Sequence, residues 1–381
     1  MDWRVPLSDL DYGIEEEQAV LDVLRSRWLT MGAVTRRFEQ AFAEMVGVRQ
    51  AVAVSSATSG LHLACLTLGL NPGDEVILPA LTFVATAAAV RYVGATPVFA
   101  DVVSETDLTL SPQSVAEKIT PRTRAIIVMH YGGYPCDMPA LTSLAQKHSL
   151  RLIEDAAHAP GASLVGRRMG SWGEVGVFSF FSNKNLVTGE GGMLTTDDPA
   201  LAEKLRSLRS HAMTSLTWDR HHGHAWSYDV TDLGYNYRPS EITSALGLAQ
   251  LQKLEKNNRR RRELTASYHR RLAEKCPGLT LPFTTHPGTS ACHLLPILLP
   301  PQTNRAAFMA GMKLKGIQTS FHYPPISDFR FYRASPPADD ALPVTCQVAS
   351  REVTLPLYPT MTSETVDVVV DAAAETLGGL S

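Results

Sequence analysis

Apolar positions along the first two thirds of the chain fall into two alternating patterns. Short runs rich in Val, Ile and Ala, apolar at nearly every position, alternate with longer stretches in which apolar residues recur at helical spacing. Runs that are apolar throughout are typical of strands buried on both faces, so the pattern predicts an α/β fold with a mostly parallel sheet covered by helices. The predicted strands are 51–54, 75–78, 96–100, 125–129, 152–154, 175–181 and 192–196, and the predicted helices are 58–70, 81–93, 111–119 and 138–148.

The alternation ends before a different kind of sequence begins. Residues 211–232 are rich in His, Trp, Ser and Thr without a period, which predicts a long loop. Pro239 then suits the first turn of a long helix, and proline becomes frequent farther on. We expect a large domain, residues 1–250, that includes the N-terminal segment, and a smaller α+β domain, residues 251–381. The predicted elements are helices at 240–271, 305–314 and 363–377 and strands at 291–299 and 317–322.

The composition is that of an ordinary globular protein. The 381 residues carry 35 Lys and Arg against 38 Asp and Glu, a net charge of −3, which disfavours a general nucleic-acid binder. The basic run Arg259–Arg262 points all round a helix and favours a solvated surface, although it leaves a partner-binding role open. No apolar run reaches the ~18 residues of a membrane helix, and the N-terminus lacks a secretory pattern. We therefore expect no nucleic-acid partner, no membrane partner and a cytoplasmic location.

Cysteine and histidine usage points to no metal site. The five cysteines are odd in number, widely spaced and without a CxxC motif, which argues against a disulfide framework or structural zinc and fits a reducing compartment. His221, His222 and His224 cluster in the predicted loop without a nearby acid or cysteine, so we expect no metal there. Cys136 has no predicted base beside it, which favours a packed thiol over a nucleophile.

The segment Ser179–Gly192 carries the most chemical information. Lys184 leaves an apolar strand and enters a Gly-rich turn, where its amine would stand at the mouth of a buried site. Because burial disfavours the ammonium form, such a lysine can lose its proton and attack a carbonyl, and lysine is the usual Schiff-base partner of pyridoxal phosphate (PLP). Taken alone, a lysine after a strand is more often a solvated side chain.

Two further segments follow predicted strands: one contains Asp155 and His158, and the other is residues 55–60. Asp155 could keep a pyridinium nitrogen protonated, or it could simply cap the helix that follows. His158 could contact a cofactor ring or pack. Residues 55–60, with the sequence Ser-Ser-Ala-Thr-Ser-Gly, could form an anion site at a helix N-terminus, although capping also explains these hydroxyls. An anion holder, an electron-sink partner and a Schiff-base lysine together meet the requirements of a PLP site.

The sequence resembles the DegT/DnrJ/EryC1/StrS family, the PLP-dependent sugar aminotransferases of fold type I. The resemblance covers nearly the whole chain, and its most specific part is the SFxxNKNxxTGEGG pattern from Ser179 to Gly192. It implies a fold type I architecture with PLP as the cofactor. The other segments that carry it are 28–32, 55–64, 79–86, 154–158, 233–238, 316–324 and 355–359.

The resemblance also implies roles for single residues. It implies that Lys184 forms the Schiff base and that Asp155 is the partner of the pyridine nitrogen. His158 matches a position that approaches the cofactor's ring hydroxyl, and Phe83 matches the aromatic residue that lies against the ring. The remaining matches are Thr58, Ser59 and Ser179 at the phosphate, Asn236 and Arg238 at the cofactor or substrate phosphates of the neighbouring subunit, and His322 and Tyr323 on the substrate side.

The activity implied is transfer of an amino group from an amino acid, with L-glutamate expected, to a keto sugar attached to a nucleoside diphosphate. The partners implied are these two substrates and a second copy of the chain, in a homodimer with shared active sites. Sugar dehydratases that resemble this family have His at the position of the lysine, so the presence of Lys184 argues against a dehydratase. Another PLP lyase or decarboxylase stays open, as does a non-catalytic regulator of the same fold.

Overall fold

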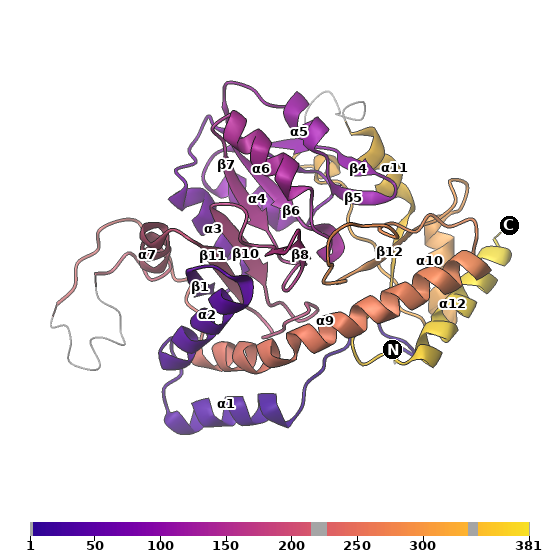
Figure 1. Ribbon diagram of the computed structural model, residues 1–381, viewed down its shortest axis with the longest axis horizontal. Coiled ribbons are helices and arrows are strands. Elements are labelled where there is room, and N and C mark those ends of the chain that lie inside the picture. Colours follow the sequence, from indigo (N-terminus) through magenta and orange to yellow (C-terminus); the bar gives the residue numbers. More distant parts are fainter. Residues whose placement is uncertain (1–2, 215–226, 334–341, 381) are drawn as a thin grey trace.

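The computed structural model describes residues 3–214, 227–333 and 342–380. A sheet lies at its centre (Figure 1). The sheet has seven strands in the order β1-β11-β10-β7-β6-β2-β3. Neighbouring strands pair in parallel except around β11, which is antiparallel to both β1 and β10. The predicted mostly parallel α/β sheet is confirmed. The strands are β1 (Gln50–Val54), β2 (Glu75–Pro79), β3 (Thr96–Ala100), β6 (Thr123–Met129), β7 (Arg151–Asp155), β10 (Val175–Ser179) and β11 (Gly192–Thr196).

Both faces of this sheet are buried. Successive strand residues point to opposite faces, and in β7 Leu152 and Ile153 accordingly belong to two different hydrophobic clusters. Val177 and Phe178 of β10 divide in the same way. Since each face needs an apolar cover, helices pack on both sides. The first cluster includes residues of α2 (Ala33–Val46), α5 (Pro112–Glu117) and α6 (Met138–Lys147), and the second includes residues of α3 (Ala57–Thr67), α4 (Val84–Tyr92) and α7 (Pro199–Leu208).

The long helix α9 (Glu241–Lys275) runs from the sheet to the C-terminal part of the chain (Figure 1). Its first residue, Glu241, accepts hydrogen bonds from the backbone N–H groups of Gly32, Val34 and Thr35 at 2.8, 2.8 and 2.9 Å. A carboxylate at these donors satisfies the N-terminus of α2. Helix α1 (Ile14–Ser26) packs along α9. The predicted boundary between residues 250 and 251 falls inside α9, and the division into two domains stays a prediction.

The C-terminal part packs around its own hydrophobic cluster, which includes Leu295, Phe308, Val353 and Val369. Val5, from the other end of the chain, packs in the same cluster, and its N–H donates to the carbonyl of Gly316 at 3.1 Å. The elements here are β12 (Leu295–Leu298), α10 (Arg305–Leu314), α11 (Pro343–Arg351), β13 (Glu352–Leu355) and α12 (Ser363–Gly378), with β12 and β13 antiparallel.

The predicted strand at 317–322 is wrong. The segment forms single bridges to two different partners, at Ile317 with Val5 and at Ser320 with Thr354, so no continuous ladder develops. The partner of β12 is instead β13, which the sequence pattern did not separate from its surroundings. The pattern also missed α1, α2, α7 and α11, together with the short hairpins β4 (Val102–Ser104) with β5 (Asp107–Leu110) and β8 (Ser163–Leu164) with β9 (Arg167–Arg168).

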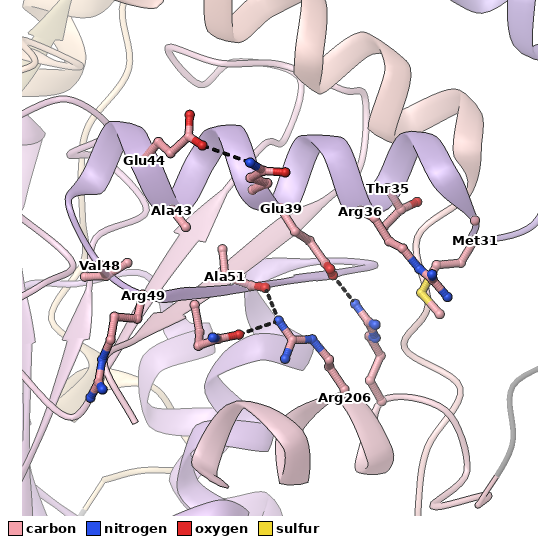
Figure 2. Close-up of a pocket in the computed structure, with 14 residues that line it drawn as sticks. Met31, Thr35, Arg36, Glu39, Ala43, Glu44, Val48, Arg49, Ala51 and Arg206 are labelled. Carbon is pink, nitrogen blue, oxygen red and sulfur yellow. Dashed lines mark hydrogen bonds and ion pairs between the residues drawn. The ribbon is translucent and has the colours of Figure 1, made fainter. Parts of the chain in front are cut away.

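Strand β1 lies at the edge of the sheet, and charged side chains cover its open side (Figure 2). Arg209 donates to the carbonyl of Ala53 at 2.6 Å, and Glu39 accepts the N–H of the same residue at 2.9 Å. Arg206 donates to the carbonyl of Ala51 at 3.1 Å. Unpaired backbone groups on an edge strand invite pairing with other chains, and here charged groups occupy them.

Two predictions depend partly on residues 215–226. His221, His222 and His224 lie outside the described residues, as does the middle of the predicted loop. Within the described ranges, no three His, Cys, Asp or Glu side chains are grouped to hold a metal ion. None of the helices in these ranges is both long and apolar enough to cross a membrane.

Candidate active site

A cavity of about 390 Å³ opens at the carboxyl edge of the sheet. Strands β1, β7 and β10 end at this edge, which is where open α/β sheets bind ligands. Segments far apart in sequence therefore meet there. The predicted site residues that line the cavity are Thr58, Phe83, Asp155, His158, Ser179, Lys184, His322 and Tyr323. Ser59, Asn236 and Arg238 are not among its lining residues.

Lys184 lies in a tight turn after β10. Its backbone N–H donates to the carbonyl of Phe181 at 2.9 Å, and the next residues return so that Thr188 N–H reaches the carbonyl of Phe180 at 2.9 Å. Burial of the amine lowers the pKa of Lys184 to about 8, although the nearby Asp155 acts in the opposite direction. A lysine with this pKa has a substantial neutral fraction near pH 7.5, which a nucleophile or a proton acceptor requires.

Asp155 is the last residue of β7 and is buried. The hydroxyl of Thr86 donates to its Oδ2 at 2.8 Å, and the N–H of Ala157 donates to its Oδ1 at 3.2 Å. Burial raises the pKa of Asp155, against these hydrogen bonds and the charge of Lys184. In the described structure β7 is followed by a turn, so Asp155 is not the cap of a following helix. A carboxylate held by two donors in an enclosed site can face a cationic ligand.

His158 is buried, and this burial lowers its pKa well below the usual value. The charges of Lys184 and His322 lower the pKa further. Gly132 N–H donates to its Nδ1 at 3.3 Å, so Nδ1 is an acceptor. The proton of the neutral ring then resides on Nε2, 3.1 Å from the hydroxyl of Tyr323, to which it donates. This contact joins the sheet to the C-terminal part of the chain.

The N-terminus of α3 forms a polar cup at the cavity. Ser56 caps the helix by accepting the N–H of Ser59 at 3.1 Å, and the Ser59 hydroxyl accepts the N–H of Ser56 at 3.1 Å. Ser59 therefore caps the helix, which is one of the two roles that the sequence left open for it, the other being a phosphate contact. The N–H groups of Ala57 and Thr58 open the helix and have no acceptor within it. A Cβ on Gly192 would lie 2.6 Å from the backbone of Ser56, so only glycine lets β11 pack against this cup.

Phe83 and Ser179 complete the wall of the cavity. Phe83 is 54% exposed, and its ring centroid lies 5.9 Å from that of Tyr323, with the two rings tilted by 55°. Ser179 ends β10 and is buried, with its hydroxyl 3.4 Å from the N–H of Phe181. Both residues line the cavity that also contains Asp155 and Thr58.

Asn236 and Arg238 lie beside the edge strand, outside the cavity of their own chain. Between them, Tyr237 accepts the N–H of Ser55 at 2.8 Å through its carbonyl and donates its N–H to Arg209 at 3.0 Å. The hydroxyl of Tyr237 lies 3.0 Å from Nδ1 of His62. Burial and the neighbouring Arg209 lower the pKa of Arg238.

Sequence reasoning missed several residues that support the site. Asn185 donates through Nδ2 to Asn258 of α9 at 2.8 Å and to the carbonyl of Ala291 at 2.7 Å, and its Oδ1 lies 3.0 Å from His293 Nδ1. The signal for Asn185 was present, because it follows the lysine within the same motif. Asn258 and His293 gave no signal, since their contacts join distant parts of the chain.

Comparison with known proteins identifies the family of the whole chain. Residues 11–374 match the DegT/DnrJ/EryC1/StrS aminotransferase family. The spore coat polysaccharide biosynthesis protein SpsC of Bacillus subtilis is 39% identical over 373 residues, which cover 96% of this chain and 95% of SpsC.

Solved structures agree as well. The putative sugar aminotransferase Spr1654 of Streptococcus pneumoniae in its PLP form is 26% identical, with a TM-score of 0.92 and coverage of 99% of both chains. DesI in the presence of its TDP-sugar product is 33% identical, with a TM-score of 0.87 over 98% of this chain and 92% of DesI. The fold class, the enzyme class and the cofactor predicted from the sequence are confirmed. The chain belongs to the DegT/DnrJ/EryC1/StrS aminotransferase family and is a PLP-dependent aminotransferase.

Proposed function

We propose that the protein transfers the amino group of an amino acid, L-glutamate, to a keto sugar linked to a nucleoside diphosphate, as a step in amino-sugar synthesis. The observation that carries this proposal is the meeting of Lys184 and Asp155 in one cavity, each with a pKa displaced by burial. Membership of the family and the TDP-sugar product of DesI support the choice of substrate.

The cavity fits PLP by its donors and its shape. The free N–H groups at the start of α3, together with Thr58 and Ser179, would hold the phosphate, and Asp155 would face the ring nitrogen. Phe83 would lie against the ring, and His158 would stand near its hydroxyl. When bound, PLP supplies an electron sink for the carbon that loses its proton.

Lys184 moves the proton in this proposal. Because its pKa is lowered to about 8, its amine can accept a proton from the donor's amino carbon and return it to the sugar carbon. Thr86 and Ala157 keep the Asp155 carboxylate in place. On the substrate side, His322 and Tyr323 line the cavity from the C-terminal part and would contact the sugar.

The active site is completed by a second copy of the chain in our proposal. Asn236 and Arg238 lie outside the cavity of their own chain, although an arginine fork is well suited to a phosphate. In a homodimer they would reach the phosphates bound in the neighbouring subunit. A helix cap at Asn236 and a surface ion pair at Arg238 are the alternative readings. The division near residue 250 and the cytoplasmic location are retained as proposals.

Release of 2-oxoglutarate from L-glutamate tests the activity. The holoenzyme should release at most about one equivalent per active site from L-glutamate alone, and continuous release should require an added nucleoside-diphosphate keto sugar, which should gain an amino group by mass spectrometry. A lyase or decarboxylase would consume the amino acid without the sugar, and a dehydratase would remove water from the sugar without glutamate. A regulator of the same fold would bind no PLP.

A further inference from the structure

Three polar side chains form a connected series that ends in the active-site cavity. Glu352 and Thr354 stand two residues apart on β13, so their side chains leave the same face of the strand. The Thr354 hydroxyl lies 2.6 Å from Glu352 Oε1 and 2.7 Å from Nδ1 of His322. Glu352 is 1% exposed, whereas His322 is one of the residues that line the cavity with Lys184. A buried carboxyl is thereby connected to the substrate side of the cavity.

The geometry fixes where a proton on Glu352 would reside. The backbone N–H of His322 donates to Oε2 at 2.7 Å, so Oε2 is an acceptor and the acidic proton belongs on Oε1, facing Thr354. With the carboxylate ionised, Thr354 donates to Glu352 and accepts from Nδ1–H, which leaves a lone pair on Nε2 of His322. With the carboxyl protonated, both hydrogen bonds reverse and Nε2 carries the proton.

Electrostatics favour the carboxyl as the place where the proton is held. Burial raises the pKa of Glu352 to about 8, against its hydrogen bonds and the charge of Arg305. Burial and the charge of Lys184 lower the pKa of His322 to about 4. A proton taken up at Nε2 is therefore more stable on Glu352 than as an imidazolium. The other titratable groups that act on His322 or Glu352 are Tyr131, His158, His293 and Tyr323.

We propose that Glu352, Thr354 and His322 form a proton relay that acts beside Lys184 as a second acid–base group, which exchanges protons with the oxygen atoms that enter and leave the substrates. The inference rests on the proposed function. In transamination, an oxygen from water enters the donor product in the first half of the reaction, and the keto oxygen leaves the sugar in the second half. Lys184 transfers protons to and from the carbon atoms of the substrates, and the relay transfers protons to and from their oxygen atoms.

The proton balance closes over one catalytic cycle. When water replaces nitrogen on the donor carbon, an O–H bond of water breaks and its proton goes to Nε2. The Nδ1 proton then passes to Thr354, and the Thr354 proton passes to Glu352. When nitrogen replaces oxygen on the sugar carbon, the C–O bond breaks, Nε2 gives its proton to the departing oxygen, and both transfers reverse. Water supplies the proton and water carries it away, so no further reactant is needed.

The tautomer of His322 reports the relay directly, without turnover. In ¹⁵N-histidine-labelled holoenzyme, one of the 12 histidines is assigned to His322 through loss of its signals in His322→Gln. We expect the ring to change from Nε2–H to Nδ1–H with a midpoint at about pH 8, as Glu352 ionises, and to stay neutral throughout. Thr354→Val should abolish the change, and Thr354→Ser should restore it. Glu352→Gln, which donates to Thr354 at every pH, should lock Nε2–H.

Turnover supplies the second measurement. Thr354→Val should lower kcat by about 10²-fold with KM within about twofold, because general acid–base catalysis has that magnitude and the binding groups remain. Thr354→Ser should recover most of the loss. Thr376→Val is the matched control, because it also removes a buried threonine hydroxyl, one that donates to the Ala372 carbonyl within α12. It should leave kcat unchanged.

Each outcome separates the relay from the proposed function. A His322 ring that becomes an imidazolium, or that keeps one tautomer from pH 6 to 10, overturns the relay even if transamination is found. Persistence of the switch in Glu352→Gln overturns it as well, and this variant decides the question if Thr354→Val fails to fold. An intact switch without sugar-dependent release of 2-oxoglutarate would instead refute the proposed function.

Discussion

Two charged hollows in this protein differ in what their charges do. The groove beside β1 has a volume of about 540 Å³ and the active-site cavity about 390 Å³. In the groove, Arg209 and Glu39 form an ion pair at 2.6 Å. Both side chains also hydrogen-bond the backbone of Ala53. In the cavity, Asp155 acts on Lys184 through its charge, but within the described residues the two side chains do not form an ion pair.

The comparison teaches that size and charge do not identify an active site. In the groove, Arg209 and Glu39 form an ion pair, and with Arg206 they occupy backbone groups of the edge strand, so these three charges have a structural use. The cavity charges are enclosed with displaced pKa values, and that displacement disfavours the charged form of Lys184. Substitutions should therefore have different effects in the two hollows. Substitutions in the cavity should lower turnover, and substitutions in the groove should lower stability.

The largest expected effect is on turnover in the cavity. Lys184→Ala should lower sugar-dependent amino transfer by on the order of 10⁴-fold or more, because both the nucleophile and the proton carrier are removed. Thermal unfolding of the cofactor-free protein should be unchanged or shifted upward, since an enclosed amine is lost. Parallel kinetics and calorimetry check this pair of results, and a folded variant with full activity would contradict the assignment of Lys184.

Mixed dimers sharpen the boundary of the cavity. Lys184→Ala and Arg238→Ala should each be inactive alone. After unfolding and refolding together in equal amounts, activity should return to about a quarter of wild type, because half of the dimers are hybrids with one intact site. Native mass spectrometry confirms that hybrids are present. Hybrids without activity would place both residues in the site of one chain.

A substitution in the groove should have the opposite profile. Glu39→Ala leaves Arg209 buried without its partner and should reduce the free energy of unfolding by about 3–5 kcal/mol. Glu39→Gln is the matched control, since its amide oxygen can still accept the N–H of Ala53, and it should lose less. Urea unfolding measures both variants. Folded Glu39→Gln with strongly reduced kcat would show that the groove is not merely structural.

The smallest effect is the dependence of stability on pH. The folded-state pKa of Lys184 is lowered from 10.5 to about 8, so the folded protein binds fewer protons than the unfolded chain between these values. Stability should therefore rise with pH across this window, and the cost of the enclosed ammonium is fully present below pH 8. Lys184→Met in the cofactor-free state should stabilise most below pH 8 and progressively less toward pH 10. An equal gain at all pH values would contradict the lowered pKa.

The sheet could be predicted from the sequence because its strands are apolar on both faces, as Leu152 and Ile153 illustrate. Helix α1 could not, because few of its side chains are buried: Ile14 is 69% exposed and Leu24 47%. Its apolar residues therefore form no clear core-facing stripe. The 317–322 segment has strand-like composition but divides its pairing between two partners, which no local pattern reveals.

The candidate site was predictable where strand ends and a motif coincide. Asp155 ends its strand, and Lys184 and Thr58 follow theirs; the carboxyl ends of these strands meet at one edge, so topology brings the three residues together. Glu352 and Thr354 could not be identified, because their meaning comes from contact with His322, which is distant in sequence. The location of Arg238 depends on a second chain, and one sequence does not specify that contact.

The most direct test of the central claim is chemical trapping at the cavity. Holoenzyme is reduced with borohydride, digested and mapped by mass spectrometry, with the Glu39→Gln variant as a groove control. We expect one phosphopyridoxyl group per chain, on the peptide that contains Lys184, in both proteins. A label on a different lysine, or a label lost through the groove substitution, would contradict the assignment of the smaller cavity as the active site.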